Sequence, residues 1–65
     1  MKITLNGEPR TIDSDNLARA LHELGYADAV VATALNGHFV AAPVRSETTL
    51  QDGDRLEVVA PMQGG

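Results

Sequence analysis

The last two residues of the sequence, Gly64 and Gly65, point most directly to chemistry. Glycine loses more backbone entropy on folding than any other residue and has no side chain to bury, so a Gly-Gly end adds little to stability. An extended backbone without Cβ atoms can instead pass through a slot too narrow for other residues. We therefore expect the α-carboxylate of Gly65 to enter the active site of another protein, where it is activated and loaded.

The residues before this pair are expected to form the rest of a flexible tail. We place the domain boundary between residues 1–59 and residues 60–65, because no strand pattern continues beyond residue 59. Six extended residues span about 20 Å at roughly 3.3 Å per residue. Pro61, Met62 and Gln63 are thus expected to line a partner's channel together with Gly64, and Met62 either contacts that partner or packs on its own chain.

Other candidate chemistry is weaker. His22 and His38 have no third ligand or carboxylate partner at a suitable spacing, so both are interpreted as surface residues rather than metal ligands. Asp52 and Asp54 flank Gly53, but the calcium-loop pattern is missing and a turn explains them. No metal or bound cofactor is expected.

Composition limits the class of protein. A chain of 65 residues forms one domain, and without cysteine its core has to come from aliphatic side chains. The net charge of −4 and the five dispersed basic residues argue against nucleic-acid binding. No apolar run is long enough for a bilayer and no signal-peptide pattern is present, so a cytoplasmic protein without membrane contact is expected.

The first half of the sequence predicts a hairpin and a helix. Residues 1–5 alternate between apolar and polar, as in a half-buried strand, and Asn6-Gly7 is typical of a tight turn into a second strand at residues 10–12. Pro9 places that strand at a sheet edge. N-capping residues at 13–16 and a leucine stripe over residues 17–24 predict a helix of about three turns, closed by Gly25.

The second half predicts another hairpin and a last strand. The apolar run at residues 30–35 is interpreted as a strand that turns at Asn36-Gly37 into a short partner containing Phe39. Residues 44–50 show no strong period and are expected to be an irregular connection. Residues 51–54 predict a turn and residues 55–59 a strand.

This order of elements predicts an α+β protein of the β-grasp class, with a mixed sheet of four to five strands and one main helix packed on one face. The first and last strands lie parallel in the sheet centre, so the last strand anchors the tail. If the second hairpin directs Phe39 away from the helix, Phe39 belongs to an apolar docking surface on the open face; the alternative is that it packs in the core.

The sequence resembles the ThiS family of small ubiquitin-like sulfur carriers of thiamine biosynthesis. The resemblance is carried by residues 34–40, by residues 50–59 and by the terminal Gly64-Gly65. Members often have a basic residue, a serine and an aromatic after the proline that follows the second hairpin. Residues 43–48 contain no aromatic, so the packing of that connection departs from the pattern.

The resemblance implies that the chain is a substrate of enzymes rather than an enzyme. An E1-like adenylyltransferase would use ATP to adenylate the Gly65 carboxylate, a cysteine desulfurase system would supply sulfur for a thiocarboxylate, and thiazole synthase would take that sulfur. The residues agree, because a chain without cysteine cannot hold sulfur as a persulfide and has no phosphate-binding loop of its own.

Three alternatives remain at this point. The sulfur goes to molybdopterin, as in the small subunit of molybdopterin synthase, or the chain is conjugated to lysines as a protein modifier. A more distant alternative is a β-grasp binding module without tail chemistry.

Overall fold

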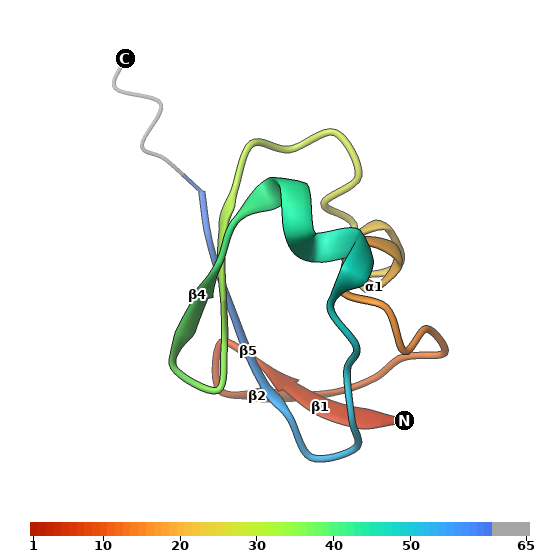
Figure 1. Ribbon diagram of the computed structural model, residues 1–65. Coiled ribbons are helices and arrows are strands. Elements are labelled where there is room, and N and C mark those ends of the chain that lie inside the picture. The colour runs from red at the N-terminus through yellow and green to blue at the C-terminus, as the bar shows by residue number, and fades with distance from the viewer. Residues whose placement is uncertain (61–65) are drawn as a thin grey trace.

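A computed structural model describes residues 1–60 of the chain as one five-stranded mixed sheet with a helix on one face (Figure 1). The strand order is β2-β1-β5-β3-β4, and β1 and β5 pair in parallel while the other neighbours are antiparallel. This topology is a β-grasp and confirms the predicted fold class. The strands and helices are β1 (Lys2–Leu5), β2 (Glu8–Thr11), α1 (Leu17–Glu23), β3 (Ala32–Leu35), β4 (His38–Val40), η1 (Ala42–Glu47) and β5 (Arg55–Val59).

The core forms between the sheet and α1. Alternation along β1 and β5 directs one set of side chains toward the helix, as the sequence pattern predicted. Leu17 and Leu21 of α1 close the core from the other side. The buried apolar residues are Ile3, Leu5, Ile12, Leu17, Ala20, Leu21, Leu50, Leu56 and Val58.

The helix α1 begins where predicted but is shorter, with seven residues instead of about three turns. Asn16 is the N-cap, and its side chain accepts the N–H of Arg19 at 3.1 Å. At the other end Gly25, at φ +97°, donates to the carbonyl of His22, and Tyr26 donates to the carbonyl of Leu21. These two bonds are a Schellman motif and confirm the role predicted for Gly25.

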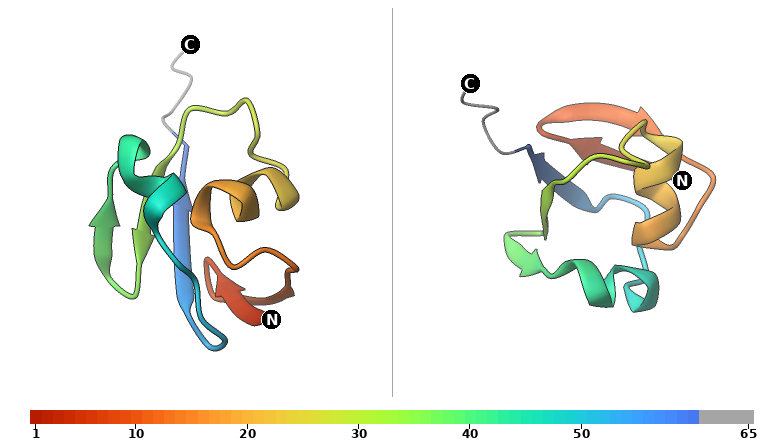
Figure 2. Two further views of the ribbon diagram at one scale, coloured as in Figure 1. Left: turned by 45° about the vertical axis from the view of Figure 1, so that its right-hand side comes forward. Right: turned by 90° about the horizontal axis from the view of Figure 1, so that it is seen from above.

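Two segments differ from the sequence-based expectation. The strand predicted from residue 30 begins only at Ala32, opposite Val59, and Val30 is 79 % exposed. The connection expected to be irregular from residue 44 contains the 3₁₀ helix η1, with a proline in its first turn. Figure 2 shows η1 beside α1 on the same face of the sheet, so this connection adds a second element to the helical layer.

The edge strand β2 carries Pro9 within its span, as expected of a residue that cannot donate to a ladder. It starts at Glu8 rather than at residue 10, and Ile12 follows it as a fully buried side chain. The longest α-helix in residues 1–60 has seven residues, and no described helix is long and apolar enough to cross a membrane.

The carboxylate of Glu23 ties the end of α1 to the segment before it. Its Oε2 accepts the N–H of Asp13 at 2.7 Å and its Oε1 accepts the N–H of Ser14 at 3.1 Å. The bond from Asp13, followed by that from Ser14, lowers the pKa of Glu23 below its ordinary value of 4.5. A lowered pKa means that the native state is stabilised by the ionised form.

We expect Glu23 to make stability depend on pH below its ordinary pKa. Its contribution is fully present above that value and is lost as the pH falls through the lowered native pKa. Glu23→Gln should therefore lower the urea midpoint at neutral pH, and the difference from the parent chain should shrink on acidification. Glu8→Gln removes the same charge from an exposed strand and is the control. A difference that stays constant with pH would contradict this role.

Candidate functional site

The candidate site is the end of β5, the strand that directly precedes the residues predicted to form the tail. The strand lies in the middle of the sheet, between β1 and β3. Ala60, which follows it in the chain, is the last residue that the structure describes. The residues predicted to carry the chemistry and to line a partner's channel lie outside the described residues; they are Pro61, Met62, Gln63, Gly64 and Gly65. The described structure therefore shows how the base of the tail is held.

Asn6 holds β5 on the side where β1 ends. Its backbone N–H donates to the carbonyl of Leu56 at 2.9 Å, which continues the parallel ladder one residue past β1. Its side chain then acts as a further ladder residue: Oδ1 accepts the N–H of Val58 at 2.9 Å and Nδ2 donates to the carbonyl of Val58 at 3.1 Å. The side chain of Asn6 thus bonds both backbone polar groups of Val58 on the side of β5 where β1 has already ended.

Asn36 makes the corresponding contact near the start of β5. Its N–H donates to the carbonyl of Arg55 at 2.8 Å, its Oδ1 accepts the N–H of Arg55 at 2.9 Å, and its Nδ2 donates to Asp54 at 3.0 Å. Asn6 and Asn36 have φ values of 50° and 51°, and each is followed by a glycine at positive φ, which fits the predicted turns. The two turns, one after β1 and one after β3, therefore bind the central strand β5 from both sides.

Removing the Asn6 side chain should weaken the end of β5. Asn6→Gly keeps the positive φ accessible but deletes two part-buried hydrogen bonds, so we expect a loss of about 1–3 kcal/mol of unfolding free energy and faster amide exchange at Val58. Urea unfolding and native-state hydrogen exchange measure the two effects.

Asn36→Gly is the matched control for Asn6→Gly. Its side-chain bonds are exposed, so its loss of stability should be smaller and should leave the exchange of Val58 unchanged. Equal effects of the two substitutions at Val58 would contradict a specific role for Asn6.

The sheet face opposite α1 is open and carries Phe39. In β3 the buried Thr33, 1 % exposed, points to the helical layer, so the adjacent Ala34 points to the open face. Ala34 pairs with Phe39 on one side and with Glu57 on the other, which puts all three on that face. Phe39 is 72 % exposed, and this direction decides between the two alternatives left by the sequence: Phe39 is outside the core.

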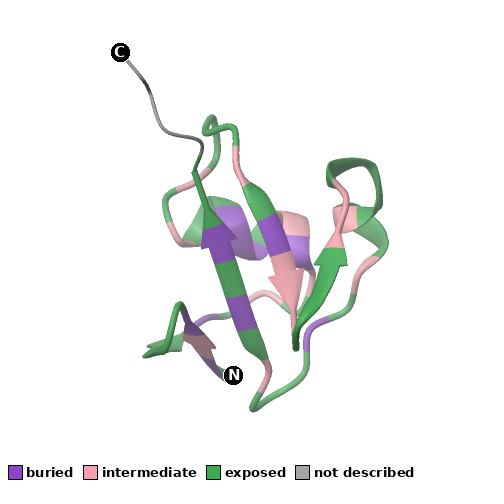
Figure 3. Cartoon of the chain, turned by 90° about the vertical axis from the view of Figure 1, so that its left-hand side faces the viewer, coloured by how far each residue is buried: buried purple, intermediate pink, exposed green. Residues whose placement is uncertain are grey.

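The open face reaches the base of the tail. Val59, the last residue of β5, is 64 % exposed and pairs with Ala32. Figure 3 views this face, with buried and exposed residues alternating along β5 and the helix behind the sheet. We use the name open face for Ala32, Ala34, Phe39, Glu57 and Val59. Its apolar members run from the edge strand β4 to the last residue of β5.

The other candidates from the sequence lie on different elements and form no cluster at this end of β5 in the described residues. His22 and His38 are exposed, one on α1 and the other at the start of β4. Asp52 accepts the N–H of Lys2 in β1 at 2.7 Å, and Asp54 accepts the N–H of Gln51 within the turn at 2.7 Å, so both carboxylates have structural partners. No cluster of three potential metal ligands occurs within residues 1–60.

Three positioning residues escaped the sequence analysis. Asn6 and Asn36 were interpreted only as turn formers, although an Asn-Gly turn next to a central strand offers a side-chain amide to that strand. Arg45 was counted among dispersed charges, but it bonds to Val31 and Thr33 and so links η1 to β3. The sequence signal for Arg45 was its position in residues 43–48, the segment that lacks the aromatic residue often found there in the family.

Comparisons with known proteins agree with this structure. A family model described as the ThiS family matches residues 3–65. The sulfur carrier protein ThiS of Thermus thermophilus is 41 % identical over 63 residues, which cover 97 % of this chain and 98 % of that protein. A thiazole synthase of Paramagnetospirillum magneticum is 36 % identical over 66 residues; the match covers all of this chain but only 20 % of that protein.

Solved structures give the same result. The crystal structure of the thiamine biosynthesis protein ThiS from Geobacter metallireducens superposes with a TM-score of 0.83 and 36 % identity, and each chain is covered completely. A complex of subunits 1 and 2 of the molybdopterin-converting factor from Helicobacter pylori contains a chain that matches with a TM-score of 0.57 and 30 % identity, covering 98 % of this chain and 96 % of that one. The match of the family model over nearly the whole sequence and the 41 % identity to a curated carrier, on a β-grasp fold, show that this chain belongs to the ThiS family.

Proposed function

We propose that the chain carries sulfur for thiamine biosynthesis as a thiocarboxylate on Gly65. The observation that carries the proposal is the match to the ThiS family from residue 3 through residue 65, which includes the terminal Gly-Gly pair. The described domain supports this role because β5, held by Asn6 and Asn36, leads directly into those residues.

The chemistry requires activation by another protein. A carboxylate is a poor electrophile, so an oxygen of Gly65 first attacks the α-phosphorus of ATP and releases pyrophosphate. The terminal sulfur of a persulfide supplied by a cysteine desulfurase system then attacks the carbonyl and AMP leaves. A second thiol of that system reduces the resulting acyl disulfide, which releases the thiocarboxylate and leaves the two thiols joined as a disulfide. The chain has no cysteine to hold sulfur elsewhere, which favours the carbonyl carbon as the place of attachment.

An E1-like adenylyltransferase and thiazole synthase are the partners that fit this sequence of steps. The thiazole synthase relative supports the second partner, since it contains a segment similar to this entire chain within a protein about five times as long. In that relative the carrier-like segment and the synthase share one polypeptide. We infer that this chain docks on the corresponding enzyme and delivers Gly65 to it.

Intact-protein mass spectrometry tests the function. The purified chain is incubated with the adenylyltransferase, ATP and a sulfur source, and the mass should rise by the difference between sulfur and oxygen. The mass of the fragment that contains Gly65 then places the change. An unchanged mass in the complete mixture, with adenylate formed on a known carrier in parallel, would overturn the proposal.

The open face is proposed as the docking surface. Phe39→Ala should weaken binding to thiazole synthase or to the adenylyltransferase by about 1–3 kcal/mol, because exposed aromatic side chains dominate such interfaces. His38→Ala is the matched control and should bind normally, because this exposed neighbour in β4 pairs with Leu35, opposite the buried Leu56, and so faces the helical side. Isothermal titration calorimetry measures both, and equal affinities for the two variants would contradict docking through this face.

Sulfur delivery to molybdopterin is the second candidate. The molybdopterin-converting factor complex supports it, since one chain of that complex shares the fold at 30 % identity. The superposition on ThiS is closer, with a TM-score of 0.83 against 0.57, which favours the thiazole route. Transfer of labelled sulfur to a thiazole product rather than to molybdopterin separates the two.

A further inference from the structure

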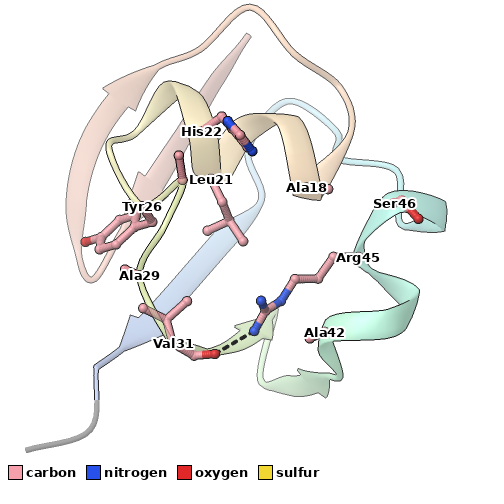
Figure 4. A pocket seen from close by; sticks show the side chains of 10 residues that line it. Ala18, Leu21, His22, Tyr26, Ala29, Val31, Ala42, Arg45 and Ser46 are labelled. Carbon is pink, nitrogen blue, oxygen red and sulfur yellow. Dashed lines mark hydrogen bonds between the residues drawn. The ribbon is translucent and has the colours of Figure 1, made fainter.

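A cavity of about 210 Å³ lies in the helical layer, between α1, the loop that leads into β3, and η1 (Figure 4). Its walls are alanine, leucine, valine and tyrosine side chains, and its polar groups are contributed by Arg45, Ser46 and His22. It is on the opposite side of the sheet from the open face. The sulfur chemistry of Gly65 does not involve this cavity.

The Arg45 guanidinium is fixed at one wall of this cavity. Its Nε donates to Thr33 Oγ1 at 3.0 Å and its Nη2 donates to the carbonyl of Val31 at 2.7 Å. Thr33 in turn donates to the carbonyl of Val40 at 2.7 Å, so the hydroxyl is bonded as donor and acceptor. A guanidinium has five N–H groups, and these two bonds set its plane while others remain. Figure 4 shows the free end of the guanidinium directed into the cavity.

The charge of Arg45 is not balanced within the cavity. Both of its hydrogen-bond partners in residues 1–60 are neutral oxygens, and no Asp or Glu of the described chain lines the walls. Arg45 is half-buried, where a cation loses part of its hydration and gains from an anionic partner. The pre-set plane of the guanidinium suits two parallel bonds to one carboxylate.

The cavity is near the base of the tail. Val31, whose carbonyl holds Arg45, directly precedes Ala32, and Ala32 pairs with Val59 at the end of β5. A protein that takes in residues 60–65 therefore approaches the end of the domain where this cavity lies. The cavity volume is below the about 300–1,000 Å³ of small-molecule sites and suits a single side chain.

We propose that the Arg45 cavity is a carboxylate-binding subsite that receives an Asp or Glu side chain of the protein that takes the tail. The subsite itself follows from the contacts of Arg45, and only the source of the carboxylate rests on the proposed function. An acidic side chain of the partner would form two N–H···O bonds with the guanidinium.

The first test uses the full chain alone, with glutarate as the probe. Nuclear magnetic resonance should show saturable shifts of the Arg45 Nε–H and of amides around the cavity with glutarate, and none with the neutral glutaramide at the same ionic strength. Ala18→Leu fills the cavity without altering the contacts of Arg45 and should remove the glutarate shifts; Ala29→Leu, from an exposed loop position, is a second filling variant if the first fails to fold. Equal shifts with glutaramide, or shifts that persist in the folded filled variant, would overturn the subsite.

The second test identifies the source of the carboxylate. The filled variant should bind thiazole synthase or the adenylyltransferase about tenfold or more weakly, as expected when one charge-assisted pair is lost, and excess glutarate should weaken the parent chain similarly. If the parent chain binds glutarate but the filled variant binds both enzymes as tightly as the parent, the carboxylate does not come from a partner side chain. That result would overturn this part of the proposal and assign the site to a free carboxylate. Because the first test requires neither enzyme nor sulfur, failure of the subsite and failure of the carrier function give different results.

Discussion

Deleting Gly65 should abolish thiocarboxylate formation while leaving the fold intact. The shortened chain still ends in a carboxylate, that of Gly64, but the group lies one residue closer to the domain, a displacement of roughly 3.3 Å. Errors of about 1 Å in the position of a reacting group already cost on the order of a hundredfold in rate. The expected result is therefore a chain that unfolds like the parent but shows no mass increase with adenylyltransferase, ATP and sulfur source.

Two variants show whether position is the cause. Gly64→Val keeps the length and the carboxylate but adds a branched side chain, and it should load far more slowly if the partner's channel admits only a bare backbone. Gln63→Ala keeps both glycines and should load at nearly the parent rate. If the chain ending at Gly64 were loaded as fast as the parent, a geometric requirement for Gly65 would be contradicted.

Local signals account for the parts of the fold that the sequence predicted correctly. The turns at Asn6 and Asn36 depend on positive φ at two adjacent residues, a property that the Asn-Gly pair itself favours. The end of α1 depends on Gly25 in the same way, and the alternation along β5 reports directly which face is buried. In each case the residues that determine the structure are neighbours in the sequence.

The errors occur where distant residues decide the structure. The expected strand start at residue 30 was wrong because a run of small apolar residues carries no marker for where pairing with β5 begins, and the register places that point at Ala32. The helix η1 was missed because residues 42–47 have no apolar period; the segment is held by Arg45, which reaches Val31 and Thr33 across the fold. Such contacts leave no local pattern.

The same distinction applies to the site. The side-chain bonds of Asn6 join residues 52 positions apart, so the sequence could indicate the turn but not the two hydrogen bonds to Val58 in β5. The direction of Phe39 also stayed open, because an almost continuous apolar strand does not reveal which of its residues face the helix. Burial of Thr33 fixes that direction, and the open face follows from it.

Leu56→Ala should cause the largest loss of stability among single substitutions in the central strand. Leu56 is 1 % exposed and lies opposite Leu5 on one side and Leu35 on the other, so no neighbour is free to fill the space left by its side chain. Substitutions of this kind cost about 2–5 kcal/mol. A domain of 65 residues has only about 3–10 kcal/mol of stability to lose. Urea unfolding followed by circular dichroism should therefore show a much lower urea midpoint, because about a fifth or more of the total stability is lost.

Val59→Ala tests the same strand at an exposed position and should change the unfolding free energy by no more than about 0.5 kcal/mol. The two variants also show whether loading of Gly65 requires the folded domain or only the tail. If the adenylyltransferase recognises the open face, Leu56→Ala should lose loading in proportion to the unfolded fraction, and conditions that refold it should restore loading. If an unfolded Leu56→Ala chain instead loads as fast as the parent, the tail alone is sufficient for the enzyme, and docking of the adenylyltransferase through Phe39 and the open face is contradicted.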